Sequence, residues 1–92
     1  MIEINKIENC IGIKIDMGNA NLLIIKGKKG YIMCGYLNIE TANKLNDVAC
    51  IVKGVKNFDD VLNSEIVEIS EKAKEIGIKV GMKGKDVLKF IE

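Results

Sequence analysis

IGIKIDMGNANLLIIKGKKGYIMCGYL, residues 11–37, contains three strand patterns in succession. Isoleucine occupies every second position of its first five residues, which is the spacing of a half-buried β-strand. Two further apolar runs, 22–26 and 31–37, each follow a short segment of Gly, Asn or Lys that favours a tight turn. We therefore expect an antiparallel meander of three strands, with residues 2–7 as a candidate fourth strand at its edge.

After this segment the apolar spacing becomes that of short helices. Asn38, Asn57 and Ser70 each stand where a side chain can cap the first turn of a helix. Apolar residues at helical spacing follow each cap, and a terminal helix is predicted to bury Val87, Leu88 and Ile91. Two strands are predicted between the helices, over residues 48–52 and 65–69. The second of these segments also fits the apolar spacing of a helix.

These elements predict an α+β fold. We expect a two-layer α/β sandwich, with a largely antiparallel sheet and short helices packed on one face, forming a single domain over residues 1–92. Several strands are apolar on both faces, whereas four short helices can cover only one face of the sheet. Because an exposed apolar sheet is a liability in a monomer, we expect a homo-oligomer that covers the second face.

Several kinds of chemistry are excluded by the residue types that are missing. The chain has no histidine, so it can build neither a Ser-His nor a Cys-His nucleophile, nor a zinc site with imidazole ligands. Its three cysteines are widely spaced, and no P-loop or dinucleotide motif occurs. We therefore expect no metal and no cofactor. A net charge of +1 without any arginine argues against nucleic acid as a partner.

The location is predicted from the absence of targeting and membrane patterns. No apolar run approaches the roughly 18 residues that a membrane helix needs, and the charged N-terminus does not resemble a signal peptide. We expect a cytoplasmic protein that does not interact with membranes. An odd number of scattered cysteines fits a reducing compartment, in which Cys10 and Cys50 are predicted to be small buried hydrophobic residues.

The first candidate site is Cys34, which lies beside a glycine and between two tyrosines. Glycine within a strand often marks a bulge or a close backbone approach, so this thiol could form the wall of a pocket. Activated by a lysine or a helix terminus instead of histidine, Cys34 would be the candidate catalytic residue of an enzyme. The alternative is an inert core cysteine where only a small side chain fits.

The second candidate site is the glycine-spaced loop before the last helix. Backbone N–H groups at a helix N-terminus attract anions, and two lysines of this loop would reinforce the attraction. The alternative is that the glycines only permit a tight turn. The predicted ligand-binding residues are Gly81, Met82, Lys83, Gly84 and Lys85.

The chain resembles the YunC-like family of small bacterial and archaeal proteins, a domain of unknown function. The resemblance covers most of the chain and rests on ordered motifs: Gly30-Tyr31 with Cys34-Gly35-Tyr36-Leu37, Lys53-Gly54-Val55 before Phe58–Leu62, and Ala73 followed by Gly77-Ile78 and Gly81–Gly84. It implies a two-layer α/β sandwich and brings no established activity or cofactor. Lys83 stands where the family pattern often has a small hydroxyl residue, which leaves no hydroxyl to cap the last helix.

Three functions are compatible with the sequence. The first is a non-catalytic, oligomeric module that binds a small anionic ligand at Gly81–Lys85. The second is an enzyme that depends on Cys34 without histidine. The third is an adaptor whose partner is another protein.

Overall fold

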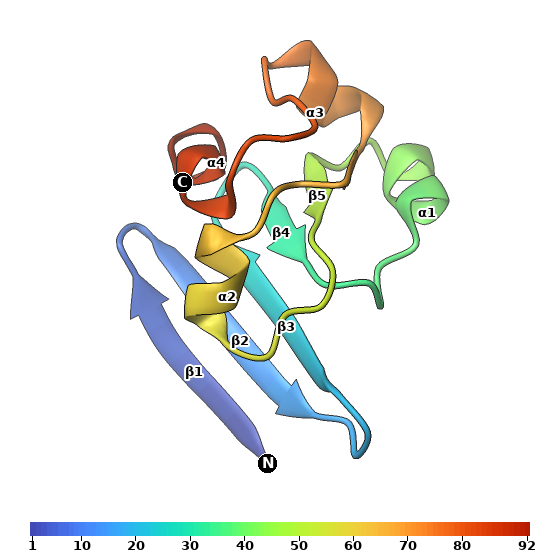
Figure 1. Ribbon diagram of the computed structural model, residues 1–92. Coiled ribbons are helices and arrows are strands. Elements are labelled where there is room, and N and C mark those ends of the chain that lie inside the picture. The colour runs from blue at the N-terminus through green and yellow to red at the C-terminus, as the bar shows by residue number, and fades with distance from the viewer.

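The computed structural model describes residues 1–92 and contains one six-stranded sheet with four short helices (Figure 1). The strands lie side by side in their order along the chain. Every neighbouring pair is antiparallel except the fourth and fifth strands, which are parallel. The strands are β1 (Ile2–Ile7), β2 (Cys10–Asp16), β3 (Asn21–Lys26), β4 (Tyr31–Met33), β5 (Ala49–Ile51) and β6 (Glu68–Ile69).

The helices begin where the capping residues predict. Asn38 Oδ1 accepts a hydrogen bond from the Glu40 amide, and Asn57 Oδ1 accepts one from the Asp60 amide. Ser70 Oγ caps the third helix in the same way, so all three predicted caps are confirmed. The helices are α1 (Ile39–Lys44), α2 (Phe58–Asn63), α3 (Glu71–Glu75) and α4 (Gly84–Ile91). None of them is long and apolar enough to cross a membrane.

Three strands are shorter than the sequence predicts, and the one expected over 48–52 loses one residue at each end. The strand expected over 31–37 ends at Met33, because the Leu37 amide bonds to the Cys34 carbonyl oxygen and closes a turn. The strand expected over 65–69 pairs with β5 only at its last two residues. N-terminal to these two residues, the Ile66 amide donates to the Met82 carbonyl oxygen at 2.7 Å. Ile66 is therefore hydrogen-bonded to the loop before α4 instead of to β5.

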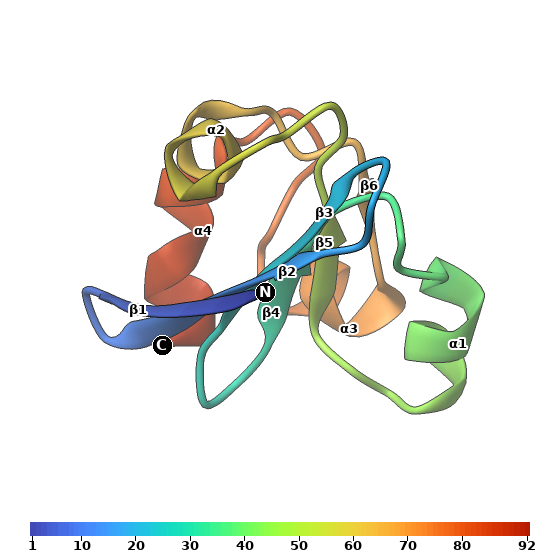
Figure 2. The same cartoon turned by 90° about the horizontal axis from the view of Figure 1, so that it is seen from below.

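One apolar core lies between the sheet and the helices. Figure 2 shows α2 above the sheet and α1 beside β5, at the opposite end of the molecule from β1. The confirmed fold class is therefore α+β, a mostly antiparallel sheet with a few short helices. Both Cys10 and Cys50 belong to the core, as predicted. Its thirteen buried residues are Cys10, Leu23, Ile25, Ile32, Cys50, Val52, Val61, Ile66, Ala73, Ile78, Val87, Leu88 and Ile91.

Candidate functional site

Three adjoining hollows lie at one end of the sheet, and Asn21 lines all of them. The first has a volume of about 260 Å³ and is lined by Ala20, Asn21, Cys34, Gly35, Tyr36, Gly54 and Val55. The second shares four of these residues and adds polar ones from the β2–β3 turn together with Lys56. The third reaches the start of β1 and includes Glu3, Lys14 and Asp16. We call the first one the Cys34 hollow.

Strand direction brings the walls of the Cys34 hollow together. Asn21 begins β3, and Cys34 follows the end of β4, which runs antiparallel to β3. Since β5 is parallel to β4, the chain that leaves β5 reaches the same edge of the sheet and supplies Gly54 and Val55. Residues 20, 34 and 54 therefore converge although they are far apart in sequence.

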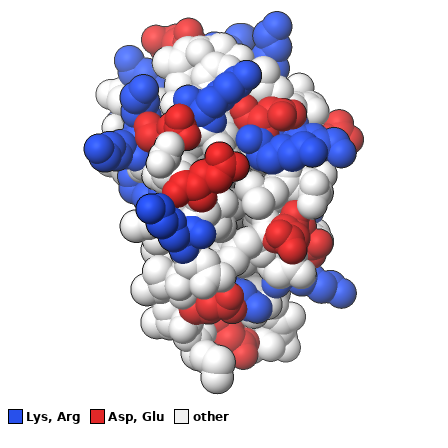
Figure 3. All heavy atoms as spheres, turned by 90° about the vertical axis from the view of Figure 1, so that its left-hand side faces the viewer, with Lys and Arg blue, Asp and Glu red and all other residues white.

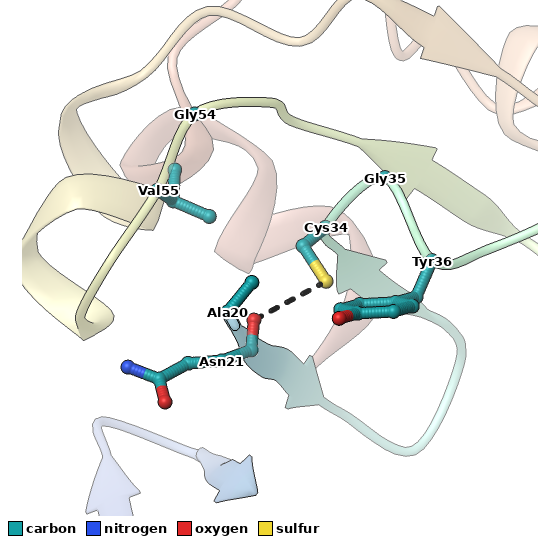
Figure 4. A pocket seen from close by; sticks show the side chains of 7 residues that line it. All are labelled: Ala20, Asn21, Cys34, Gly35, Tyr36, Gly54 and Val55. Atoms are coloured by element: carbon teal, nitrogen blue, oxygen red, sulfur yellow. Dashed lines mark hydrogen bonds between the residues drawn. The ribbon is translucent and has the colours of Figure 1, made fainter. Parts of the chain in front are cut away.

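The Cys34 thiol lies at the wall of this hollow and is 5% exposed. Its Sγ accepts a hydrogen bond from the Leu23 amide at 3.5 Å and donates one to the Asn21 carbonyl oxygen at 4.0 Å. In Figure 4 the sulfur points between Asn21 and the Tyr36 ring, while Val55 faces it across the hollow. Cys34 therefore has features of both alternatives that the sequence left open, because it lines a hollow and is also buried.

The other two thiols have surroundings that suppress reactivity. Burial raises the pKa of the Cys50 thiol to about 12. Burial, followed by the nearby carboxylates of Glu92 and Glu8, also raises the pKa of Cys10. A thiol must lose its proton to become a nucleophile, so both cysteines are structural. Cys34 is the one cysteine that lines a hollow.

The loop predicted to bind an anion lies away from all five hollows. Several of its amides are already used: Gly81 donates to the Ile66 carbonyl oxygen, Met82 to that of Lys79, and Gly84 to that of Ser64. Lys83 is the N-cap of α4 and makes no side-chain capping bond. Gly84 is buried, and a Cβ there would lie 2.1 Å from the Val61 carbonyl oxygen. The structure does not bring Gly81–Lys85 and Cys34 into one site.

A basic hollow lies at the opposite end of the β1–β2 hairpin. Lys28 and Lys29, which the sequence shows as a cluster, meet lysines from β1 and α4 there. It is lined by Lys6, Asn9, Lys28, Lys29, Lys89 and Glu92. No group of three or more Cys, Asp or Glu side chains is placed to hold a metal ion.

Sequence reasoning missed most of the residues that complete the Cys34 hollow. Ala20 and Asn21 look like ordinary turn residues, and Gly54 looks like the end of a strand. The available signal was topological, because the helix between β4 and β5 is a connection long enough for these two strands to pair in parallel, as they do. Parallel strands end at the same edge, so the segments that follow Met33 and Ile51 had to lie close together.

Comparison with known proteins places the chain in a family. Residues 33–91 match the "Domain of unknown function (DUF1805)". The chain is 32% identical over 80 residues to the "Uncharacterized protein YunC" of Bacillus subtilis (strain 168), covering 83% of this chain and 79% of that protein. A protein of unknown function from Thermoplasma acidophilum, TA1206, has a crystal structure that matches with a TM-score of 0.91 and 45% identity, over 100% of this chain and 92% of that one. The chain therefore belongs to the DUF1805 family of YunC-like proteins, whose function is unknown.

Proposed function

We propose that this chain is a non-catalytic, homo-oligomeric module that binds a small molecule in the Cys34 hollow. The observation that carries the ligand half is the convergence of three separate chain segments on one hollow of about 260 Å³ with mixed apolar and polar walls. Small-molecule sites are usually concave, mostly apolar and equipped with a few polar groups that orient the ligand.

The walls favour a ligand with an apolar end and an anionic or polar end. Val55, Ala20 and the Tyr36 ring supply the apolar contacts. The adjoining hollow carries Lys56, whose ammonium can attract an anionic group, and Asp16, which limits the negative charge that the site accepts. A small monocarboxylate with an aliphatic or aromatic group has this chemistry.

A thermal-shift screen with aliphatic and aromatic carboxylates tests the ligand half. The Ala20 methyl points into the Cys34 hollow, so Ala20→Leu should fill it and abolish any stabilisation, while Ala20→Ser should retain it. A bound ligand should also slow the alkylation of Cys34 by iodoacetamide. If no carboxylate stabilises the protein, or if Ala20→Leu responds as well as the wild type, the hollow is not the binding site.

The anion site at Gly81–Lys85 stays a prediction, and the same screen includes it. Its support is the exposure of Lys83 and Lys85 beside the start of α4. Stabilisation by inorganic phosphate that is lost in Lys83→Gln and Lys85→Gln, but retained in Ala20→Leu, would assign the ligand to this loop. Phosphate stabilisation that neither lysine variant changes would remove it.

A second candidate function is thiol chemistry at Cys34, which is favoured because Cys34 lines the hollow. The Leu23 amide that donates to Sγ holds the thiol at the wall of the hollow. The discriminating measurement is the rate of iodoacetamide labelling against pH. Fast modification of Cys34 below about pH 7 would support an activated thiol, whereas modification only after unfolding would exclude it.

A further inference from the structure

Strand register divides the sheet into a covered face and an open face. Residues that stand directly opposite each other in antiparallel strands point to the same side. One continuous row crosses four strands in this way, because Ile4 faces Ile13, Ile13 faces Ile24, and Ile24 faces Met33. Two further rows lie on the same face of the sheet, one on each side of this row. We define the open face as all three rows, of which the two further ones are Ile2, Ile15 and Leu22, and Lys6, Ile11, Lys26 and Tyr31.

No helix covers the open face on β1–β4. The face ends at β5, where Ala49 and Ile51 are buried and α1 packs against the strand. The alternate residues Leu23, Ile25 and Ile32 are fully buried under the helices, with 0% exposure. On the open face, by contrast, Ile2 is 63% and Ile4 is 66% exposed. Figure 2 shows α2 on the other side of the sheet and α1 displaced toward β5. Figure 3 shows the molecule from the β1 side, where acidic and basic side chains lie among uncharged ones.

The open face is large enough to form an interface. The four strands contain 6, 7, 6 and 3 residues. With a rise of about 3.4 Å per residue and a spacing of about 4.8 Å between strands, they give a flat area of roughly 360 Å² per copy. Side chains that project from the sheet make the solvent-accessible area larger than this flat area. A biological interface buries at least about 1,000 Å² in total over both partners. The flat area of two such faces comes to roughly 700 Å², so the projecting side chains have to supply the rest. A monomer rarely leaves an apolar patch of more than a few hundred Å² uncovered.

The charges of the open face favour a second copy of this chain as its partner. Its only charged residues are Lys6 and Lys26, which share the outermost row with Ile11 and Tyr31. An acidic partner would meet lysines at one end alone and would have to desolvate its carboxylates over isoleucines elsewhere. An identical open face is apolar over the same rows. A two-fold axis across the strands places the two lysine rows at opposite ends, so they do not repel each other.

We infer that two copies pack open face against open face, as a two-sheet sandwich about 10 Å thick with a two-fold axis across the strands. This inference rests on the homo-oligomeric half of the proposed function and is independent of the ligand. Pairing through the free edge of β1 is the competing geometry, but it would leave the isoleucines of the open face in water. The sandwich covers them.

Light scattering coupled to size exclusion tests the sandwich. The wild type should have twice the chain mass of 10.2 kDa. Ile4→Lys places two ammonium groups in the dry interface and should weaken dimerisation at least about tenfold. Ile2→Lys repeats the test at a second exposed position. The matched control is Val80→Lys, since Val80 is 59% exposed and lies outside the sheet, and it should remain dimeric.

The outcomes separate this inference from the proposed function. A dimer that tolerates both Ile4→Lys and Ile2→Lys overturns the sandwich and leaves the homo-oligomer standing with another interface. A wild type that stays monomeric at millimolar concentration overturns the sandwich and the homo-oligomer together, whereas ligand binding in the Cys34 hollow is read separately by thermal shift. Circular dichroism should show that the lysine variants remain folded, because both isoleucines are exposed in the single chain.

Discussion

Ser70 satisfies three backbone groups with one hydroxyl. Its Oγ donates to the Asp47 carbonyl oxygen at 2.6 Å and accepts from the amides of Ala49 at 3.0 Å and Ala73 at 3.2 Å. A hydroxyl has one donor and two acceptor lone pairs, so its capacity is fully used. Ser70 is the one buried polar residue, and through these bonds it fixes the start of α3 against β5.

Ser70→Ala should therefore cost more than the loss of an ordinary helix cap. We expect the free energy of unfolding to fall by about 3 kcal/mol, because the cap is lost and buried backbone groups are left unpaired. Urea denaturation measures the change. Asn57→Ala, which removes an exposed cap, is the control and should cost about 1 kcal/mol. Equal losses for the two variants would contradict the role given to Ser70.

Tyr31 should make stability depend on pH in the alkaline range. Burial, and then its hydrogen bond to Asp47, raises the pKa of Tyr31 from 10.0 to about 12. Between these values the folded protein keeps a proton that the unfolded chain has lost, so stability is fully present below pH 10.0 and decreases toward about pH 12. Tyr31→Phe should show a shallower decrease in denaturation experiments across this range. An unchanged slope would contradict the assignment.

At the scale of elements, the packing of α4 depends on a missing side chain. Gly84→Ala would place a Cβ 2.1 Å from the Val61 carbonyl oxygen of α2, so the two helices would have to separate. We expect a loss of about 1–3 kcal/mol, the usual cost of overpacking. The control is Gly35→Ala, whose Cβ meets only Lys53 Cγ at 3.9 Å and should be nearly neutral. Urea midpoints that are equal in the two variants would contradict this account.

The elements predicted best were those specified by local chemistry. Each of the three predicted caps accepts its backbone amide, and the alternation around Ile13 gives a strand. The ends of strands were predicted less well, because they depend on the partner chain. Cys34 continues an apolar run but lies in a turn, and Ile66 pairs with the loop before α4, which no local pattern could indicate.

The same distinction applies to the candidate site. The glycine and tyrosine neighbours of Cys34, which are local features, left a pocket wall and a core position as alternatives. Val55 and Asn21 could not be assigned to that pocket without the parallel pairing of β4 and β5. Gly84 shows the opposite case: its place in a glycine-spaced loop left a ligand or a tight turn as explanations, whereas its contact with α2 gives the glycine a packing role that neither alternative contained. Such a contact is invisible in the sequence.

At the scale of the whole molecule, the covered and open faces have different consequences. The covered face binds the helices, and the strand ends beside it create the Cys34 hollow. β1 has few contacts within one chain, since Ile7 is its one residue that contacts the core, and Ile2 and Ile4 lie on the open face. β1 is an edge strand that pairs with β2 alone, so its order benefits from a second copy.

Dimerisation through the open face should make thermal stability depend on protein concentration. Mass action stabilises a folded dimer by about 1.4 kcal/mol for each tenfold rise in concentration. The melting temperature should therefore increase by a few degrees between about 10 and about 100 µM. Calorimetry at both concentrations measures the shift. Ile4→Lys should melt at the same temperature in both samples, because its interface is lost, and Val80→Lys should follow the wild type. If the melting temperature of the wild type does not change with concentration, unfolding is not coupled to dissociation and the open face is not covered by a second copy.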